Sequence, residues 1–531
     1  MRPLGKQAFG LDASRLVVAF SDDILGESSV KIRIWPVALL FIGLVAAATP
    51  AIADWKRAET SGFIVYSDGD VGVLRENALQ LELFESSLRL LHGTDPSARS
   101  AQKMTIYLVG DHEGLDEVWP GVPDTVAGFY RPSDDGIFAM AIRERRNLDT
   151  LLHEYAHHFM MGSFGAGYPA WFVEGYAEYF MTADLSPRRV TIGNFSQGRA
   201  DWLGNARWLP YRDIVQNRPF QYRDPNAVAM YYAQSWLLTH WFMSDPTRMR
   251  QLLTYVGKLK EGMDSPAALE AATGLSMSDL ERTLRAYSRG RIVMRGFSSE
   301  QFPPTEVDIR ELTPGEDALL LLSLRLSSVD EDDETVVLEE VRRKTETWNT
   351  DPFAQSLLAR AELRIGERAA GEAIAQRLLE HNENNAEALR LMAEARIRAA
   401  EDDGADYAAL MGQARGYLAR AYAVNDSDFR TLYMLSMTRR GAAGFPNDND
   451  METLLAAVDL APQIPTLRFA AAQARVARGE TSEAIALLEP VASNPHGDRG
   501  AAQARAMISR IGGPVEEAAD ETEASEEHAA Q

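Results

Sequence analysis

An internal repeat in the C-terminal half is the feature that most limits what this chain can fold into. Residues Leu357–Leu363 (LLARAEL) recur 34 positions later as Leu391–Ile397 (LMAEARI). A period of this length is that of a helix pair, which buries its apolar face only by stacking on further copies. We therefore expect an all-α array over residues 314–511, where Ala and Leu recur at helical spacing. The spacing slips near residues 402–406 and 441–450, so the number of repeats stays open.

The segment Ala472–Pro490 is a second sign of this architecture. It has small residues and helix-ending residues, among them Ala474, Gly479 and Pro490, in an order that resembles tetratricopeptide (TPR) repeats. The resemblance implies stacked helix pairs with a surface that can bind a protein partner.

The region from residue 54 to about residue 300 has a mixed pattern. Short apolar runs at Phe63–Tyr66 and Met104–Val109 predict buried strands, and an amphipathic helix over Leu74–Leu91 separates them. An α+β domain over residues 54–300 is therefore expected ahead of the helical array.

Two further runs, Gly128–Tyr130 and Gly136–Ile142, complete the predicted strands of this domain. They flank the turn residues Pro132–Asp135 and predict an antiparallel hairpin, so the sheet should be small and antiparallel or mixed. After Arg146 the pattern is helical and stays so.

Residues 1–53 contain the features of an export signal. Basic residues at positions 31 and 33 precede an apolar run, and a small-x-small cleavage site lies just before Asp54. We expect translation to start near Val30 and the mature chain to be periplasmic or secreted. The alternative is an uncleaved anchor that holds the chain outside the cytoplasm, because the apolar span approaches the roughly 20 residues of a membrane crossing.

The composition excludes several classes of function. A formal charge of −23 over 531 residues repels phosphate backbones, so nucleic acid is not an expected partner. The chain has no cysteine, so a metal must be held by His and carboxylates. Residues 512–531 form an acidic segment, with seven acidic residues in Glu516–Glu527, and should stay unfolded.

The pattern with the clearest chemistry is His153-Glu154-x-x-His157. Asn147 or Asp149 can cap a helix through this motif, and a spacing of four residues then places both imidazoles on one helix face. They can converge on Zn²⁺, with Glu154 beside them to take a proton from a water molecule. His158 should point about 100° away and is left off the metal.

The third ligand should come from a second helix, because a catalytic zinc takes three protein ligands and leaves one position for water. Pro169 is typical of a helix start, and two glutamates, Glu174 and Glu178, follow on one face. We expect Glu174 to bind the metal. Glu178 should lie behind the ligands and hold the far nitrogen of His153 or His157.

These residues resemble the gluzincins, the zinc peptidases of the thermolysin and aminopeptidase group, and the two-part chain resembles the peptidase MA-like proteins. The similarity lies in the His-Glu-x-x-His motif and in Trp171 followed by Glu174-Gly175-Tyr176-Ala177, although the connection of sixteen residues after His157 is shorter than in those aminopeptidases. The family resemblance implies a zincin fold, a bound Zn²⁺ and peptide hydrolysis.

Tyr232 is the expected donor to the oxyanion of the reaction. Tyr232 and the residues that follow it resemble the aminopeptidase Tyr-Glu-x-Gly motif, and a phenol can donate a hydrogen bond to a tetrahedral intermediate. Tyr231 and His240 are reserves for this role. The strand Gly136–Ile142 lacks the carboxylate with which those aminopeptidases recognise a free amino terminus, so aminopeptidase specificity is not predicted.

Two functions follow from these patterns. The first is a zinc peptidase in which a substrate strand pairs with the edge of Gly136–Ile142 and Glu154 moves the proton. The alternative is a TPR-type scaffold that binds peptides or proteins and carries an inactive or structural zinc domain.

Overall fold

The computed structural model describes residues 55–512, except residues 125, 144–147, 166, 187, 404–405 and 496–498. The predicted export signal, Asn147 as a helix cap and the acidic segment beyond Gly512 therefore lie outside the described residues. Among the helices that are described, none is both long and apolar enough to cross a membrane.

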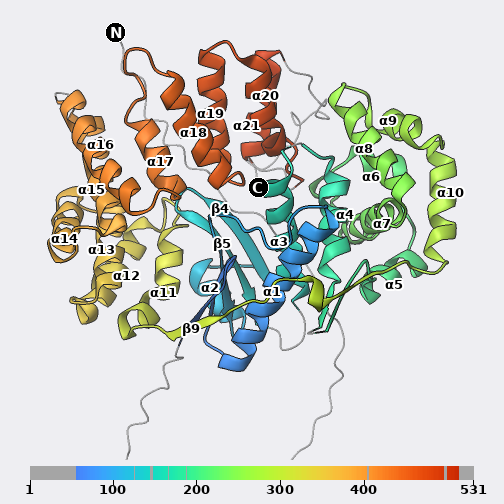
Figure 1. Cartoon of the computed structure of the whole chain (residues 1–531), viewed down its shortest axis with the longest axis horizontal. Helices are drawn as coiled ribbons and strands as arrows, with labels where there is room; N and C mark the ends of the chain where they lie inside the picture. The colour runs from blue at the N-terminus through green and yellow to red at the C-terminus, as the bar shows by residue number, and fades with distance from the viewer. Residues whose placement is uncertain are drawn as a thin grey trace, which may run out of the picture.

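A six-stranded mixed sheet lies at the centre of the N-terminal half (Figure 1). Its order is β4-β5-β3-β2-β1-β9, in which β2 pairs with β3 and β3 with β5 in parallel, and the other pairs are antiparallel. The strands are β1 (Lys56–Glu59), β2 (Phe63–Ser67), β3 (Met104–Val109), β4 (Gly128–Ser133), β5 (Gly136–Ile142) and β9 (Asp308–Glu311). The predicted strands and hairpin of this half are confirmed.

Two features of the sheet differ from expectation. β5, the predicted edge strand, is an inner strand, because β4 covers one side of it and β3 the other. The edge is therefore β4. The sixth strand, β9, comes after the predicted domain end at residue 300 and pairs with β1. The sheet is therefore complete only after the chain has formed the helices that lie between β5 and β9.

The two faces of the sheet carry different helices (Figure 1). One face packs on α1 (Val71–Leu91), α3 (Asp149–Ser163) and α4 (Ala170–Met181) through a large apolar core that includes Phe63 and Val65. The other face packs on α2 (His112–Val118) and on the first helix of the array, α11 (Pro314–Leu326). Alternate residues of β3 supply the two cores, Ile106 to the first and Tyr107 to the second, as the two-residue period of a strand requires.

The region after α4 is not helical throughout, contrary to expectation. A three-stranded antiparallel sheet interrupts it, formed by β6 (Asp184–Ser186), β7 (Arg189–Ile192) and the distant β8 (Arg295–Ser298). These strands are only three or four residues long, too short to show a clear alternation in sequence. The helices between β7 and β8 are α5 (Gln197–Asn205), α6 (Tyr211–Gln216), α7 (Pro225–Met243), α8 (Pro246–Lys260), α9 (Ser265–Thr273) and α10 (Met277–Ser288).

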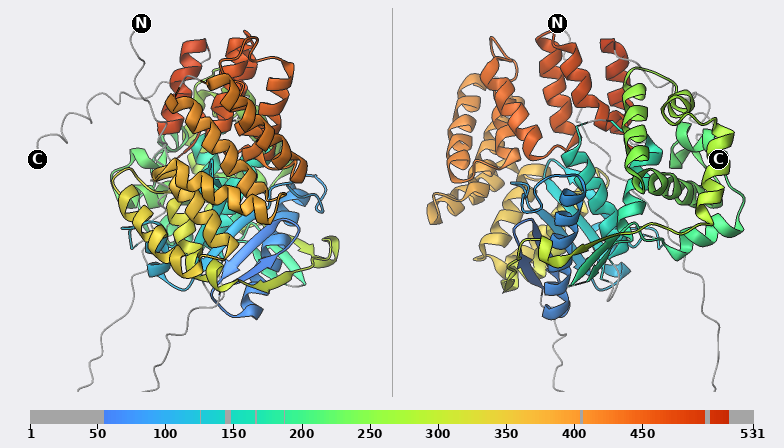
Figure 2. Two further views of the ribbon diagram at one scale, coloured as in Figure 1. Left: turned by 90° about the vertical axis from the view of Figure 1, so that its left-hand side faces the viewer. Right: turned by 45° about the vertical axis from the view of Figure 1, so that its right-hand side comes forward.

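Residues 314–511 form the array of antiparallel helices (Figure 2). After α11 come α12 (Glu334–Thr345), α13 (Pro352–Ile365), α14 (Arg368–His381), α15 (Ala386–Asp403), α16 (Tyr407–Val424), α17 (Phe429–Met437), α18 (Asp448–Leu460), α19 (Pro465–Ala477), α20 (Thr481–Ala492) and α21 (Arg499–Ile511). The starts of α13 and α15 are 34 residues apart, and so are those of α19 and α21. The spacing slips in the connections α15–α16 and α17–α18, where the sequence loses its period.

The array curves around the sheet and returns to it. Near its start, the α11 residue Asp317 accepts a hydrogen bond from the backbone N–H of Trp55, at the beginning of the sheet. Near its end, Gln463 donates to the carbonyl of His158 in α3, and the last helices lie beside α3 and α4 (Figure 2, right). The two halves therefore share an interface that runs from the sheet to α3.

Candidate metal site

The helix α3 brings the two predicted histidine ligands together. It begins at Asp149, whose carboxylate in the first turn is favourable for the helix dipole, while Leu148 at the cap position makes no side-chain cap bond. His153 and His157 lie one turn apart, and their Nε2 atoms are 3.1 Å from each other. Both side chains are buried, at 2% and 6% exposure.

The helix α4 supplies the carboxylate. Pro169 precedes its first turn, and Glu174 is fully buried, with Oε2 3.6 Å from the Nε2 atoms of both histidines. Gly175 lets α4 approach α7 closely, because an added Cβ would lie 2.4 Å from the carbonyl of Ser235. This close approach of α4 to α7 fixes the position of Glu174 relative to the two imidazoles.

The three donor atoms have the spacing of a metal site. Ligand atoms, one from each of His153, His157 and Glu174, all lie within 4.8 Å of one another. A tetrahedral cation with bonds of about 2.0–2.2 Å separates its ligand atoms by about 3.3–3.6 Å. The printed separations of 3.1, 3.6 and 3.6 Å are close to those values, and two imidazoles with one carboxylate fit Zn²⁺ with a position left for water.

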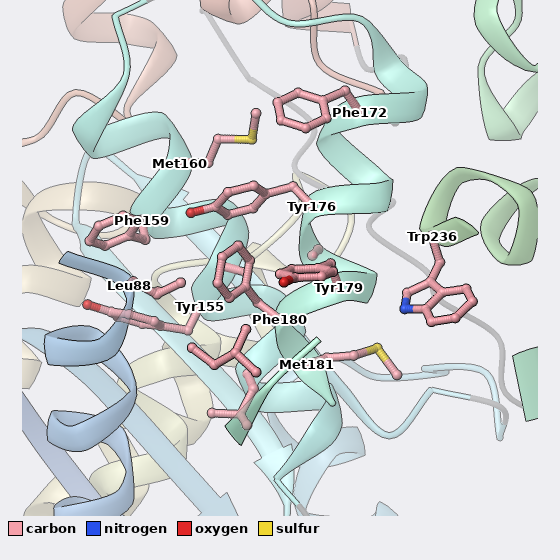
Figure 3. Close-up of a cluster of buried hydrophobic side chains, with 14 of the residues drawn as sticks. Leu88, Tyr155, Phe159, Met160, Phe172, Tyr176, Tyr179, Phe180, Met181 and Trp236 are labelled. Atoms are coloured by element: carbon pink, nitrogen blue, oxygen red, sulfur yellow. The ribbon is translucent and has the colours of Figure 1, made fainter. Parts of the chain in front are cut away.

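Apolar side chains hold the two ligand helices in place (Figure 3). Tyr155 and Phe159 of α3 and Tyr176 and Phe180 of α4 are all less than 5% exposed, and the Tyr176 and Phe180 rings lie 4.5 Å apart. Trp236 of α7 borders the same cluster (Figure 3). A core packed in this way leaves the ligand side chains little freedom to separate.

Glu154 lies beside the ligands in an unusual environment for a carboxylate. It is 3% exposed, and one of its oxygens, Oε2, has no hydrogen-bond partner among the described residues. Burial raises its pKa to about 7, and the neighbouring Glu174 adds to the rise, while His157 opposes it. A carboxyl with a pKa near neutral can both accept and return a proton.

Glu178 occupies the predicted place behind His153, but its main partner is Arg199 of α5. Arg199 donates from Nε to Oε2 and from Nη2 to Oε1, both at 2.7 Å. The distance from Glu178 Oε1 to His153 Nδ1 is 3.7 Å, too long for a hydrogen bond. The sequence analysis missed Arg199, because neither its spacing nor its neighbours distinguish it from an exposed arginine.

Tyr232 lies near the candidate ligands. Tyr231 and His240, the alternatives for its role, are hydrogen-bonded to other residues. The Tyr232 ring packs under the guanidinium of Arg199, with 5.3 Å between the guanidinium carbon and the ring centre. Burial holds the pKa of Tyr232 well above the usual value, and Glu174 adds to the rise. Tyr231 donates to the carbonyl of Asn217 at 3.1 Å, and His240 contacts Tyr287 and Gly193.

His158 faces away from the other histidines, as the helix geometry predicts. Its Nδ1 lies 3.0 Å from the hydroxyl of Tyr130 in β4, on the side of α3 toward the array. It is a structural link between the helix and the edge strand.

Comparisons with known proteins give matches among solved structures. No protein-family model matches the chain, and no curated protein matches it either. Among solved structures, the chain is similar to TTC0263, a thermophilic TPR protein in Thermus thermophilus, at 20% identity over 37% of this chain and 98% of that one, with a TM-score of 0.31. Two structures of MamA match at 13% identity over 38% and 36% of this chain and 98% and 94% of theirs, with TM-scores of 0.25 and 0.24. Scores this low do not establish a shared fold.

Proposed function

We propose that the chain is an exported zinc-dependent peptidase that cleaves peptide bonds. The observation that carries the proposal is the triangle of His153, His157 and Glu174 donor atoms, 3.1–3.6 Å apart, with the buried Glu154 beside it. A solely structural metal site has no need of an additional buried carboxylate next to the ligands, whereas hydrolysis requires a base.

The residues around the site have distinct tasks in this reaction. A bound Zn²⁺ supplies Lewis acidity, which polarises the scissile carbonyl and makes a water molecule acidic near neutral pH. Glu154 accepts the proton of that water and returns it to the leaving amine. The Tyr232 hydroxyl donates a hydrogen bond to the oxygen that becomes negative in the transition state.

The substrate is best oriented by the edge strand β4. Because β5 is an inner strand, an extended peptide would pair with β4, the edge strand of this sheet among the described residues. The contact between Tyr130 and His158 holds β4 against α3. A peptide paired with β4 would therefore have a defined position relative to the ligands on α3.

The direct test replaces Glu154 with Gln in the purified chain. We expect turnover of an unbiased peptide library to fall by about 10²–10⁴-fold while zinc stays bound, because Glu154 moves the proton and does not hold the metal. Turnover at the wild-type rate in this variant would remove Glu154 as the base.

A second candidate function, a scaffold that binds proteins, is favoured by the array itself. Stacked helix pairs present long surfaces, and these commonly bind partners. Part of this surface contacts the β4–β5 turn, because Arg364 and Arg430 both bind Asp135. The scaffold function is favoured if the wild type shows no peptidase activity and a protein partner binds the Glu154→Gln variant tightly.

Export is part of the proposal and rests on residues 31–53. N-terminal sequencing of the mature protein should find Asp54 first. A chain recovered from the membrane with the apolar span intact would support the anchored alternative.

A further inference from the structure

Among the interactions described above, Arg199 is the one cation that contacts both Glu178, behind the candidate ligands, and the ring of Tyr232. It is 8% exposed and binds both carboxylate oxygens of Glu178 at 2.7 Å. A planar guanidinium paired in this way fixes the plane of the carboxylate as well as its position. Arg199 therefore determines where Glu178 points.

Glu178 points at the back of a candidate metal ligand. Its Oε1 lies 3.7 Å from Nδ1 of His153, and this buried nitrogen makes no hydrogen bond to any described residue. A shift of a few tenths of an ångström would close the gap to a hydrogen bond. A carboxylate in this place orients an imidazole and makes its other nitrogen a better ligand.

The same guanidinium lies over the ring of Tyr232, 5.3 Å from the ring centre. The face of an aromatic ring attracts a cation, so this contact also restricts the ring. Arg199 thus links the residue behind His153 with the expected oxyanion donor, although it comes from α5, outside both motif helices.

We propose that Arg199 is a positioning residue of the metal site, which acts by holding Glu178 behind His153 and the Tyr232 ring beside the ligands. This inference rests on the proposed function. Without Arg199, Glu178 is a buried carboxylate that lacks its cation, so nothing fixes its plane and it turns toward other partners. His153 then loses its orientation, and the site binds zinc more weakly.

The experiment measures zinc affinity by competition with a fluorescent chelator, on the full mature chain and its Arg199→Met and Arg199→Lys variants. We expect Arg199→Met to weaken zinc binding about 10- to 100-fold, the usual effect of removing a group behind a metal ligand. Arg199→Lys should give an intermediate loss, because an ammonium group keeps the charge without the paired geometry.

The matched control is Arg99→Met. Arg99 binds Glu82 with side-chain exposures of 9% and 0%, close to the 10% and 1% of Arg199 and Glu178, but Glu82 lies on α1 and Arg99 in the loop after it, outside the ligand helices. This variant should lose stability and keep zinc affinity. The visible absorption of the Co²⁺-loaded chain gives a second readout, since it reports ligand geometry and should change only in the Arg199 variants.

The outcomes separate the two proposals. Wild-type zinc affinity and an unchanged Co²⁺ spectrum in Arg199→Met would overturn the positioning role and leave the proposed function intact. Equal losses of affinity in Arg199→Met and Arg99→Met would also overturn it, because the effect would then be general destabilisation. Failure of the wild type to bind zinc would overturn both proposals.

Discussion

Buried carboxylates are paired with arginines in the array and also at Glu82 and Glu178 of the N-terminal half, whereas no arginine among the described residues acts on the buried Glu154. In the array, the carboxylate of Glu362 is paired with Arg342 through two hydrogen bonds, and this contact lowers its pKa. Burial opposes ionisation of Asp428, but Arg430 and Arg390 hold its pKa below the usual value. In the N-terminal half, burial raises the pKa of Glu154 to about 7.

On the proposed function, this difference separates the residue that moves a proton from those that hold helices together. A buried carboxylate with its own arginine stabilises a fixed arrangement of helices, whereas one whose pKa is held near neutral can exchange a proton. The array achieves its packing with small residues, since Ala354, Ala359 and Ala361 are fully buried. We expect substitutions of the candidate site residues to change activity and substitutions in the core of the array to change stability.

The largest contrast is expected from two neighbouring histidines. His157→Ala removes a candidate ligand and should abolish both zinc binding and turnover. His158→Ala removes side-chain contacts with Tyr130 and Gln463, neither of which is a candidate ligand, so zinc should stay bound. Elemental analysis and peptide assays of the two variants measure this, and equal loss of zinc in both would mean that the helix, and not the ligand set, had been damaged.

The next effect concerns the two adjacent tyrosines. Tyr232→Phe keeps the ring under Arg199 and removes the hydroxyl, and kcat should fall about 10²–10³-fold, the usual effect of removing one oxyanion donor. Tyr231→Phe loses the hydrogen bond to the carbonyl of Asn217 and should cost only about 1 kcal/mol of stability. If Tyr231→Phe gives the larger loss of kcat, the roles of the two residues are reversed.

A core substitution in the array should act on stability alone. Leu488 is fully buried among Ala472, Ala484 and Met507, so Leu488→Ala leaves a cavity and should cost about 2–5 kcal/mol in urea unfolding. Zinc affinity per folded chain should stay at the wild-type value. A large fall in affinity would show that the array takes part in the site more directly than its contacts indicate.

The smallest effect is expected at the interface of the two halves. Gln463→Ala removes the bond to the carbonyl of His158 and should cost about 1 kcal/mol. Hydrogen exchange should become faster at the C-terminal end of α3, while β1 and β2 should exchange as before. Uniform faster exchange would contradict a local role.

Local patterns made part of this structure predictable. The spacing of His153 and His157 fixes a helix face, and Glu174 follows from the next apolar helix, so the triangle of donors could be expected from sequence. The strand runs Phe63–Tyr66 and Met104–Val109 were recognisable because their apolar residues are buried on the sheet.

Long-range pairing accounts for what could not be predicted. β9 pairs with β1 although about 250 residues separate them, and neither strand has a sequence pattern that identifies its partner. The inner position of β5 depends on β3, which lies before it in the chain and pairs in parallel. Arg199 became recognisable only when the fold placed it against Glu178, because an arginine on a helix is ordinarily exposed.

The most direct test of the metal site is the zinc content of the purified mature chain after dialysis against a zinc-containing buffer. We expect about one zinc per chain in the wild type and in Glu154→Gln, and none in a chain that carries both His153→Ala and His157→Ala. A wild-type chain without zinc, or a double variant that keeps it, would contradict a site formed by these two imidazoles and Glu174.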